Sequence, residues 1–213
     1  MPRAVKAGPG AQKKSLHASE RESPRVVKAR AQYREASQGL DLERLKFVNE
    51  SGVNLALTRL FGRAPKGERV VDSVPKNYGD NVTLLGALSL AGVEALMTVN
   101  GATDGEVFLT FVREMLAPTL EAGDVVIWDN LGAHRSVAVR EAVEARGARL
   151  VFLPPYSPDM NPIERCWSKI KAFLRAAKAR SREALEAAIK QALATVTESD
   201  ARAWFAHCGY ALN

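Results

Sequence analysis

The 213-residue sequence has no long apolar run: its longest uncharged stretch, residues 81–93, is too short to cross a bilayer. No apolar segment follows the basic residues at the N-terminus, so a secretory signal is not indicated. The two cysteines, Cys166 and Cys208, lack His or Cys neighbours at ligand spacing, which favours reduced core residues over a disulfide or zinc site. These absences predict a cytoplasmic protein without a membrane partner, and the length favours a single domain.

Acidic residues are missing from residues 165–182, which hold seven basic ones: Arg165, Lys169, Lys171, Arg175, Lys178, Arg180 and Arg182. The net charge of +6 is nevertheless carried by residues 1–46, with 11 Lys and Arg against 5 Asp and Glu, because residues 47–213 hold 19 of each sign. Residues 1–40 are also rich in Ala and Ser and lack sustained apolar periodicity before Ala29. They are predicted to form a basic, solvated or disordered arm or linker, and contact with a polyanion is the alternative.

Hydrophobic periodicity predicts antiparallel strands first and then alternating strands and helices. The expected strands are residues 45–48, 53–57, 82–90, 93–99, 125–128 and 149–153, and the expected helices are 104–116, 135–145, 162–179 and 181–196. The first two strands are expected to form a hairpin around the turn-forming pair Ser51-Gly52. The pattern as a whole indicates an α/β fold with a mixed sheet flanked by helices.

Two acidic residues stand where chemistry is expected in such a fold. Asp129 follows the apolar strand at residues 125–128, and ligands of open α/β sheets gather at the carboxyl ends of strands. Glu164 lies at the start of a helix, after the proline-rich segment 153–162. Each acid also has a structural explanation: Asp129 can begin a turn, and Glu164 can complete a capping box with Asn161.

The helix that carries Glu164 relates the two acids. Its apolar residues, Ile163, Trp167, Ile170 and Leu174, recur at helical spacing and are expected to face the core. Glu164 then lies at the edge of this helix, near the strand end that carries Asp129. A carboxylate pair on rigid elements suits Mg²⁺ or Mn²⁺, and two such ions can activate the attacking oxygen and stabilise the leaving oxygen at phosphorus.

The segments WDNLGAH (residues 128–134) and LPPYSPDMNPIE (residues 153–164), with 34 residues between Asp129 and Glu164, closely resemble the catalytic domain of DDE-superfamily transposases of the mariner-like bacterial insertion-sequence type. The resemblance covers residues 42–180 well and includes TRLFGRAPKG at 58–67. It divides the chain into the arm of residues 1–40, a catalytic domain at 41–180 and a C-terminal helical extension at 181–213.

The resemblance implies a ribonuclease-H-like fold and an enzyme that hydrolyses a phosphodiester at a transposon end, then joins the freed 3′-hydroxyl to target DNA. It implies a two-ion Mg²⁺ or Mn²⁺ site with Asp129 and Glu164 as the second and third acids. The implied partners are double-stranded DNA of the terminal repeats and the target, a second copy in a homodimer, and a separately encoded helix-turn-helix half, from a split or decayed gene. The implied location is the bacterial nucleoid.

The first acid of the family pattern is where this sequence departs. The family has Asp-Glu-Ser/Thr after an apolar strand, whereas Asn49-Glu50-Ser51 stands here. Asn49 keeps a carbonyl oxygen but has no charge, and Glu50 is expected to point to the opposite face of the strand. We therefore expect weak metal binding and impaired catalysis. The alternative is a non-catalytic, DNA-binding or dimerising relic that modulates active copies; another ribonuclease-H-like nuclease is disfavoured by the proline-rich segment.

Further residues are assigned by their position. Asn130, His134 and Tyr156 are expected to neighbour the active site, with capping or surface roles as alternatives, and Trp128 and Trp167 are expected in the core. The expected DNA-binding residues are Arg63, Lys66, Lys169, Lys171 and Arg175, of which the last three follow Glu164 on one helix.

Overall fold

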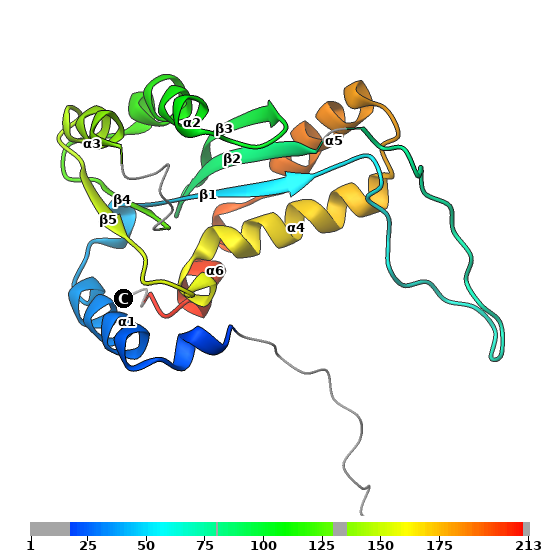
Figure 1. The fold of residues 1–213 in the computed structure, drawn as a ribbon, viewed down its shortest axis with the longest axis horizontal. Helices are drawn as coiled ribbons and strands as arrows, with labels where there is room; N and C mark the ends of the chain where they lie inside the picture. The colour runs from blue at the N-terminus through cyan, green and yellow to red at the C-terminus, as the bar shows by residue number, and fades with distance from the viewer. Residues whose placement is uncertain (1–17, 80, 130–135, 211–213) are drawn as a thin grey trace, which may run out of the picture.

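A computed structural model describes residues 18–79, 81–129 and 136–210, and its centre is a five-stranded mixed sheet (Figure 1). The strand order is β3-β2-β1-β4-β5. The strands are β1 (Leu45–Val53), β2 (Val82–Ser89), β3 (Gly92–Asn100), β4 (Val125–Trp128) and β5 (Arg149–Phe152). β1 pairs antiparallel with β2 and parallel with β4, while β2–β3 is antiparallel and β4–β5 parallel. The predicted mixed sheet is confirmed.

Helices cover both faces of the sheet, and each face has its own hydrophobic core (Figure 1). On one face lie α2 (Gly105–Phe111), which continues as a π-helical turn over Val112–Leu116, and α3 (Val137–Glu144). On the other lie α4 (Pro162–Ala177), α5 (Arg182–Ala194) and α6 (Glu198–His207). Residues of β1 alternate between the cores: Leu45 and Phe47 pack with α4, and Val48 packs with α2 and α3. This alternation determines the face of the sheet toward which the side chain of each later β1 residue points.

The predicted hairpin at residues 45–57 is wrong. Residues 45–53 form one continuous strand, in which Ser51 pairs with Leu84 and Gly52 with Thr83. Two turn-forming residues in sequence did not make a turn, because both have ladder partners on β2. After β1 the chain enters the long segment 54–79 instead, which extends away from the sheet on the right of Figure 1.

The predicted solvated arm is also wrong for its described part. Residues 19–22 form a 3-10 turn and α1 spans Pro24–Ser37, below the end of the sheet in Figure 1. Val26 and Arg30 are buried, and Tyr33 packs against the core of the α4 face. An arginine at a buried position hid the apolar pattern. The domain division at residues 40 and 180 stays a prediction.

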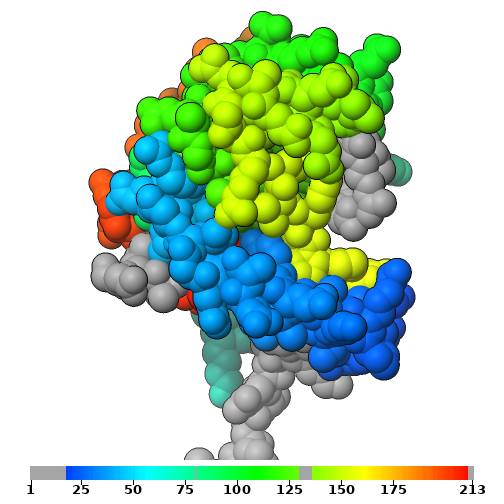
Figure 2. Space-filling view, turned by 90° about the vertical axis from the view of Figure 1, so that its left-hand side faces the viewer, coloured from blue at the N-terminus to red at the C-terminus, as the bar shows by residue number. Residues whose placement is uncertain are grey.

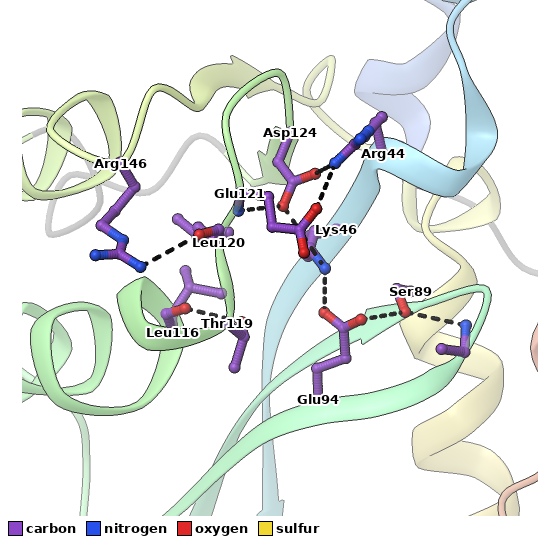
Figure 3. A network of polar contacts seen from close by, with 11 residues as sticks. Arg44, Lys46, Ser89, Glu94, Leu116, Thr119, Leu120, Glu121, Asp124 and Arg146 are labelled. Atoms are coloured by element: carbon purple, nitrogen blue, oxygen red, sulfur yellow. Dashed lines mark hydrogen bonds and ion pairs between the residues drawn. The ribbon is translucent and has the colours of Figure 1, made fainter.

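The amino ends of β1 and β4 carry a closed network of charges (Figure 3). Lys46, largely buried on β1, lies 2.5 Å from Glu94 of β3 and 3.7 Å from Asp124, which precedes β4. Asp124 also accepts a hydrogen bond of 2.9 Å from the backbone N–H of Glu121 and lies 3.5 Å from Arg44. These opposite charges compensate one another and tie three strands together.

Among the described residues, no helix is both long and apolar enough to cross a membrane.

Candidate active site

The carboxyl ends of β1 and β4 bring Asn49 and Asp129 to the same level of the sheet. The parallel register pairs Phe47 with Ile127, and both side chains belong to the core on the α4 face. Asn49 and Asp129 each follow by two residues, so the alternation of a strand directs both toward the α4 face. Glu50 lies two residues after Val48 on the same strand, so it points to the same face as Val48, which packs on the side opposite α4. This agrees with the expectation that Glu50 does not replace the missing acid.

Glu164 lies in the first turn of α4 and reaches Asn49. The amide nitrogen of Asn49 donates a hydrogen bond of 3.0 Å to Oε1 of Glu164. An amide oxygen turned toward that carboxylate would be repelled by it, so the donor orientation is the favourable one. Asn161 is the N-cap residue of α4, but its side chain makes no capping hydrogen bond. The capping explanation for Glu164 is therefore wrong, and its side chain accepts from Asn49 instead.

A glycine on β2 sets the distance between α4 and the sheet at this point. Gly86 pairs directly with Asn49, and a Cβ atom at Gly86 would lie 2.7 Å from the ring of Trp167. Trp167 is buried three residues after Glu164 on the same helix, so its ring against Gly86 fixes the helix over the strand. The predicted core position of Trp167 is confirmed, as is that of Trp128. Packing thus holds Glu164 next to Asn49.

These residues open into one cavity of about 410 Å³. Asn49, Asp129 and Glu164 line it together with the segment that runs from Leu153 into α4. Within that segment, the described lining residues are Leu153, Pro154, Pro155, Tyr156, Ser157, Pro158 and Asn161. The sequence-based expectation that Asp129 and Glu164 are neighbours is met, and Tyr156 lies where it was expected. Asn130 and His134 lie outside the described residues.

The wall of the cavity is held by α1. Arg30 is 6% exposed and donates from Nη1 to Ser157 Oγ at 2.6 Å, and from Nη1 and Nη2 to the two oxygens of Asp159 at 3.0 and 2.7 Å. Arg21 adds a contact of 3.0 Å to Asp159. Figure 2 shows α1 (blue) lying along the segment that follows β5 (yellow-green). The forked pairing fixes the geometry of this loop, in which Tyr156 has a φ of 55° that few non-glycine residues adopt.

Arg30, Ser157 and Asp159 form a clamp on the cavity wall, and the neighbouring positive charges change the pKa of Asp159. Partial burial by itself favours the neutral acid, but the hydrogen bond and charge of Arg30, with the charge of Arg21, outweigh it and hold the pKa of Asp159 below its ordinary value. The clamp is therefore ionised at neutral pH. A second anchor lies further along α1, where Tyr33 donates to the hydroxyl of Tyr210 at 2.8 Å and Tyr210 donates to the carbonyl of Met160 at 2.8 Å.

The donor set at the cavity fits one hard divalent cation better than two. Asp129 and Glu164 supply carboxylate oxygens, which Mg²⁺ and Mn²⁺ prefer. The third position is an amide whose nitrogen faces Glu164. Over the residues that the structure describes, no group of three or more His, Cys, Asp or Glu is placed to hold a metal ion. The buried Oδ1 of Asn161, in the wall of this cavity, also lacks a hydrogen-bond partner there.

The expected DNA-binding residues lie outside this cavity, and their role stays a prediction. Lys169 contacts Asp200 at 2.6 Å and the carbonyl of Thr195 at 2.7 Å, so it ties α4 to the end of α5 and to the first turn of α6. Its hydrogen bond is the main cause that lowers the pKa of Asp200 to about 2. Burial and the charge of Arg175 lower the pKa of Lys171, against the opposing effect of Glu164. Arg63 and Lys66 are exposed on the segment between β1 and β2.

Both cysteines are free in the structure. Cys166 is buried in α4 and Cys208 is partly buried after α6. Burial raises the pKa of Cys166 to about 12 and that of Cys208 to about 11, so both thiols stay protonated at neutral pH.

The sequence analysis missed the residues of α1 and of the loop that builds the wall. Arg30, Ser157 and Asp159 form the clamp, and Arg25 lines the cavity beside the acids. Ser157 and Asp159 stood inside the proline-rich motif. Arg25 and Arg30 gave no signal, because each was one of several basic residues in a segment without apolar periodicity.

Curated relatives of this chain are transposases of nematodes. The chain is 30% identical over 132 residues to the transposable element Tcb1 transposase of Caenorhabditis briggsae, an alignment that covers 58% of this chain and 48% of that protein. With the transposable element Tc1 transposase of Caenorhabditis elegans it shares 27% identity over 113 residues, covering 51% of this chain and 41% of that protein. The chain thus spans less than half the length of these relatives.

Solved structures share the fold. A Mos1 transposase paired-end complex with the left transposon end matches 93% of this chain and 62% of that chain, with a TM-score of 0.72 and 15% identity. The catalytic domain of Mos1 mariner transposase matches 92% of this chain and 91% of that chain, with a TM-score of 0.62 and 14% identity. These likenesses confirm the predicted ribonuclease-H-like fold. A family model described as DDE superfamily endonuclease matches residues 44–186, so the chain belongs to the DDE superfamily of endonucleases.

Proposed function

We propose that this chain is the catalytic region of an insertion-sequence transposase that cuts a phosphodiester at a transposon end and joins the freed 3′-hydroxyl to target DNA. The observation that carries the proposal is the cavity in which Asp129 and Glu164 meet at the family's two motifs. The Mos1 neighbour is a paired-end complex with a transposon end, and the nematode relatives are transposases. Both support double-stranded DNA as the substrate, and the paired-end complex supports a homodimer as the assembly. A helix-turn-helix partner encoded separately stays a prediction.

Asp129 and Glu164 would hold a divalent cation, Mg²⁺ or Mn²⁺. A bound cation supplies charge stabilisation at the scissile phosphate and favours the ionised form of an attacking water or hydroxyl. Asp129 follows β4 and Glu164 lies in the first turn of α4, and the proline-rich segment forms one wall of the cavity. Complexes of the Mos1 catalytic domain with Mg and with Mn support this choice of ions.

Asn49 weakens the site in two ways. It removes one of three anionic ligands from a site that would hold two dications. Its amide also donates to Oε1 of Glu164, so the group that replaces the first acid presents a donor, and not an anionic ligand, toward this carboxylate. We therefore propose that this chain binds one cation weakly and catalyses cleavage poorly.

The test compares the natural chain with Asn49→Asp. Residues that only support a metal ligand change activity by about 10–100-fold, so restoring a ligand is expected to raise Mn²⁺-dependent nicking of supercoiled plasmid or transposon-end DNA by about 100-fold or more. Saturating Mn²⁺, at about 100 times its Kd, is expected to stabilise the Asn49→Asp chain by about 2.7 kcal/mol in thermal unfolding, and the natural chain by less. Asn49→Asp with Glu164→Gln is the matched control, which should lose both effects. Equal, robust nicking by the natural chain and Asn49→Asp would contradict impairment.

A second candidate function is a non-catalytic relic that binds DNA or dimerises with active copies and so modulates them. The presence of Asn49 favours this function, because it replaces the first of the family's three acids, whereas Asp129 and Glu164 match the other two. The same assay distinguishes the two functions. A chain in which Asn49→Asp binds duplex DNA but nicks it no faster would be such a relic.

A further inference from the structure

Among the described residues that line the acid cavity, Arg25 is the one basic residue. It lies in the first turn of α1, more than 100 residues from Asp129 in sequence. An exposed arginine at a helix start is most often a solvated surface residue, so its presence at the cavity needs an independent reason to carry meaning. Three features of its surroundings give that reason.

The first feature is a fixed backbone. Arg25 lies between Arg21 and Arg30, and both of these contact Asp159. The pairing of Tyr33 with Tyr210 holds the far end of α1. The start of α1 is thereby fixed relative to the loop whose residues line the cavity, so Arg25 is presented to the cavity from a rigid position.

The second feature is that the guanidinium is available. Within the part of the chain that the structure describes, no hydrogen bond or ion pair engages Arg25. By contrast, Arg21 and Arg30 on the same segment are both bonded to Asp159. The segment therefore uses two arginines to hold itself in place, and the third lines the cavity without a partner among the described residues.

The third feature is the charge of the cavity. Asp129 and Glu164 repel a phosphate, and an anionic ligand needs a positive partner to enter beside them. A guanidinium presents several N–H donors in a fork that matches the oxygens of a phosphodiester.

We propose that Arg25 binds a non-bridging phosphate oxygen of the nucleic-acid strand that enters the acid cavity. The inference rests on the proposed function and adds a residue to it: α1 supplies a fixed cation for the phosphate, in addition to any divalent ion held by the carboxylates. Part of the affinity for DNA is then independent of metal and comes from this one side chain.

The experiment uses the full chain, natural and with Asn49→Asp, each carrying Arg25→Ala, Arg25→Lys or Lys28→Ala. Lys28 is the matched control, because it is an exposed cation on the same helix that does not line the cavity. Binding of a fluorescein-labelled 20-base-pair duplex is measured by anisotropy at several salt concentrations in EDTA. Mn²⁺ binding to the same proteins is measured by calorimetry in the absence of DNA.

Arg25→Ala is expected to weaken duplex binding by about tenfold and to reduce the slope of log K against log salt by about 0.9, as for one lost phosphate contact. Arg25→Lys should keep the slope and lose less affinity, because it keeps the charge without the fork. Arg25→Ala should also tighten Mn²⁺ binding by about twofold or more, since a like charge has left the cavity. Lys28→Ala should leave Mn²⁺ binding unchanged and duplex binding within about twofold.

Equal loss of duplex binding in Arg25→Ala and Lys28→Ala, with unchanged Mn²⁺ affinity, would overturn the role of Arg25. The proposed function would then still stand if Asn49→Asp nicks DNA. Absence of duplex binding by both the natural chain and Asn49→Asp would overturn the proposed function together with this inference.

Discussion

Strand β4 is four residues long and is flanked by two aspartates, Asp124 before it and Asp129 after it, whose surroundings differ sharply. Asp124 is 2% exposed and lies within reach of Lys46, Arg44 and a backbone N–H (Figure 3). Asp129 lines an open cavity beside Glu164 and Asn49. The neighbouring strand β1 repeats the contrast, with the ion-paired Lys46 near its start and the amide of Asn49 further along.

We call the amino ends of β1 and β4 the closed end and their carboxyl ends the open end. At the closed end charged residues serve the structure, whereas at the open end they line a cavity. At the amino ends of the two strands, each carboxylate has its cation within the fold, so a ligand would have to displace a partner that is already in place. At the carboxyl ends, Glu164 has no ion pair among the described residues, and its side chain accepts from the amide of Asn49. A carboxylate without a built-in cation, as Glu164 is here, leaves room for a cation to bind. Three experiments test this distinction.

The largest effect is expected from Lys46→Met at the closed end. Lys46 is largely buried, and its loss leaves the buried Asp124 with Arg44 as its one remaining cation among the described residues, and Glu94 without its cation. Breaking a buried pair by removing one partner is expected to lower the free energy of unfolding by about 3 kcal/mol, measured in urea. Glu164→Gln at the open end is the control and should change it by about 0.5 kcal/mol or less, since Gln keeps an acceptor for Asn49. Similar losses in both variants would remove the distinction between the ends.

The elements of the open end were predictable from sequence because their signals are local. The strand at residues 125–128, the helix starting at Pro162 and the spacing of apolar residues on that helix sufficed to place Asp129 and Glu164 as neighbours. The hairpin at residues 45–57 failed because its turn residues obtained ladder partners on a distant strand. Non-local pairing overrides local turn preference, and a single sequence does not display it.

The clamp on the cavity wall could not be predicted for a related reason. α1 buries Val26 and Arg30, so a charged residue occupies a position where periodicity requires an apolar one. Arg30 is tolerated there only because Asp159, 129 residues away, is its partner. Such a pair is recognisable only when both halves of the chain are placed in space.

The second prediction concerns this clamp, which joins the open end to α1. Asp159→Asn leaves the guanidinium of Arg30 buried without its carboxylate and is expected to lower the free energy of unfolding by about 1.5 kcal/mol at pH 7. The pKa of Asp159 is lowered in the folded state, so its contribution is complete above the ordinary pKa near 3.8 and is lost as the pH falls below it.

The difference in Tm between the natural chain and Asp159→Asn should therefore be largest at pH 6–7 and shrink toward pH 3, as measured by circular dichroism. Glu22→Gln serves as control, because Glu22 is an exposed carboxylate of the same segment and should show no such difference. A difference in Tm that stays constant down to pH 3 would show that the carboxylate of Asp159 is not the partner that holds the wall.

The smallest effect on stability is expected at Asn161, and its smallness is informative. A side chain that caps a helix contributes about 1 kcal/mol, as Thr197 is expected to do through its reciprocal bonds with Asp200 at the start of α6. Asn161 makes no such bond at the start of α4, and its buried oxygen is unsatisfied. We expect Asn161→Ala to change the free energy of unfolding by less than about 0.5 kcal/mol, and Thr197→Ala to lower it by about 1 kcal/mol. A loss at Asn161 as large as that at Thr197 would assign it to capping; a small one leaves its polar group to a ligand of the cavity, because an unsatisfied buried oxygen does not otherwise stabilise the fold.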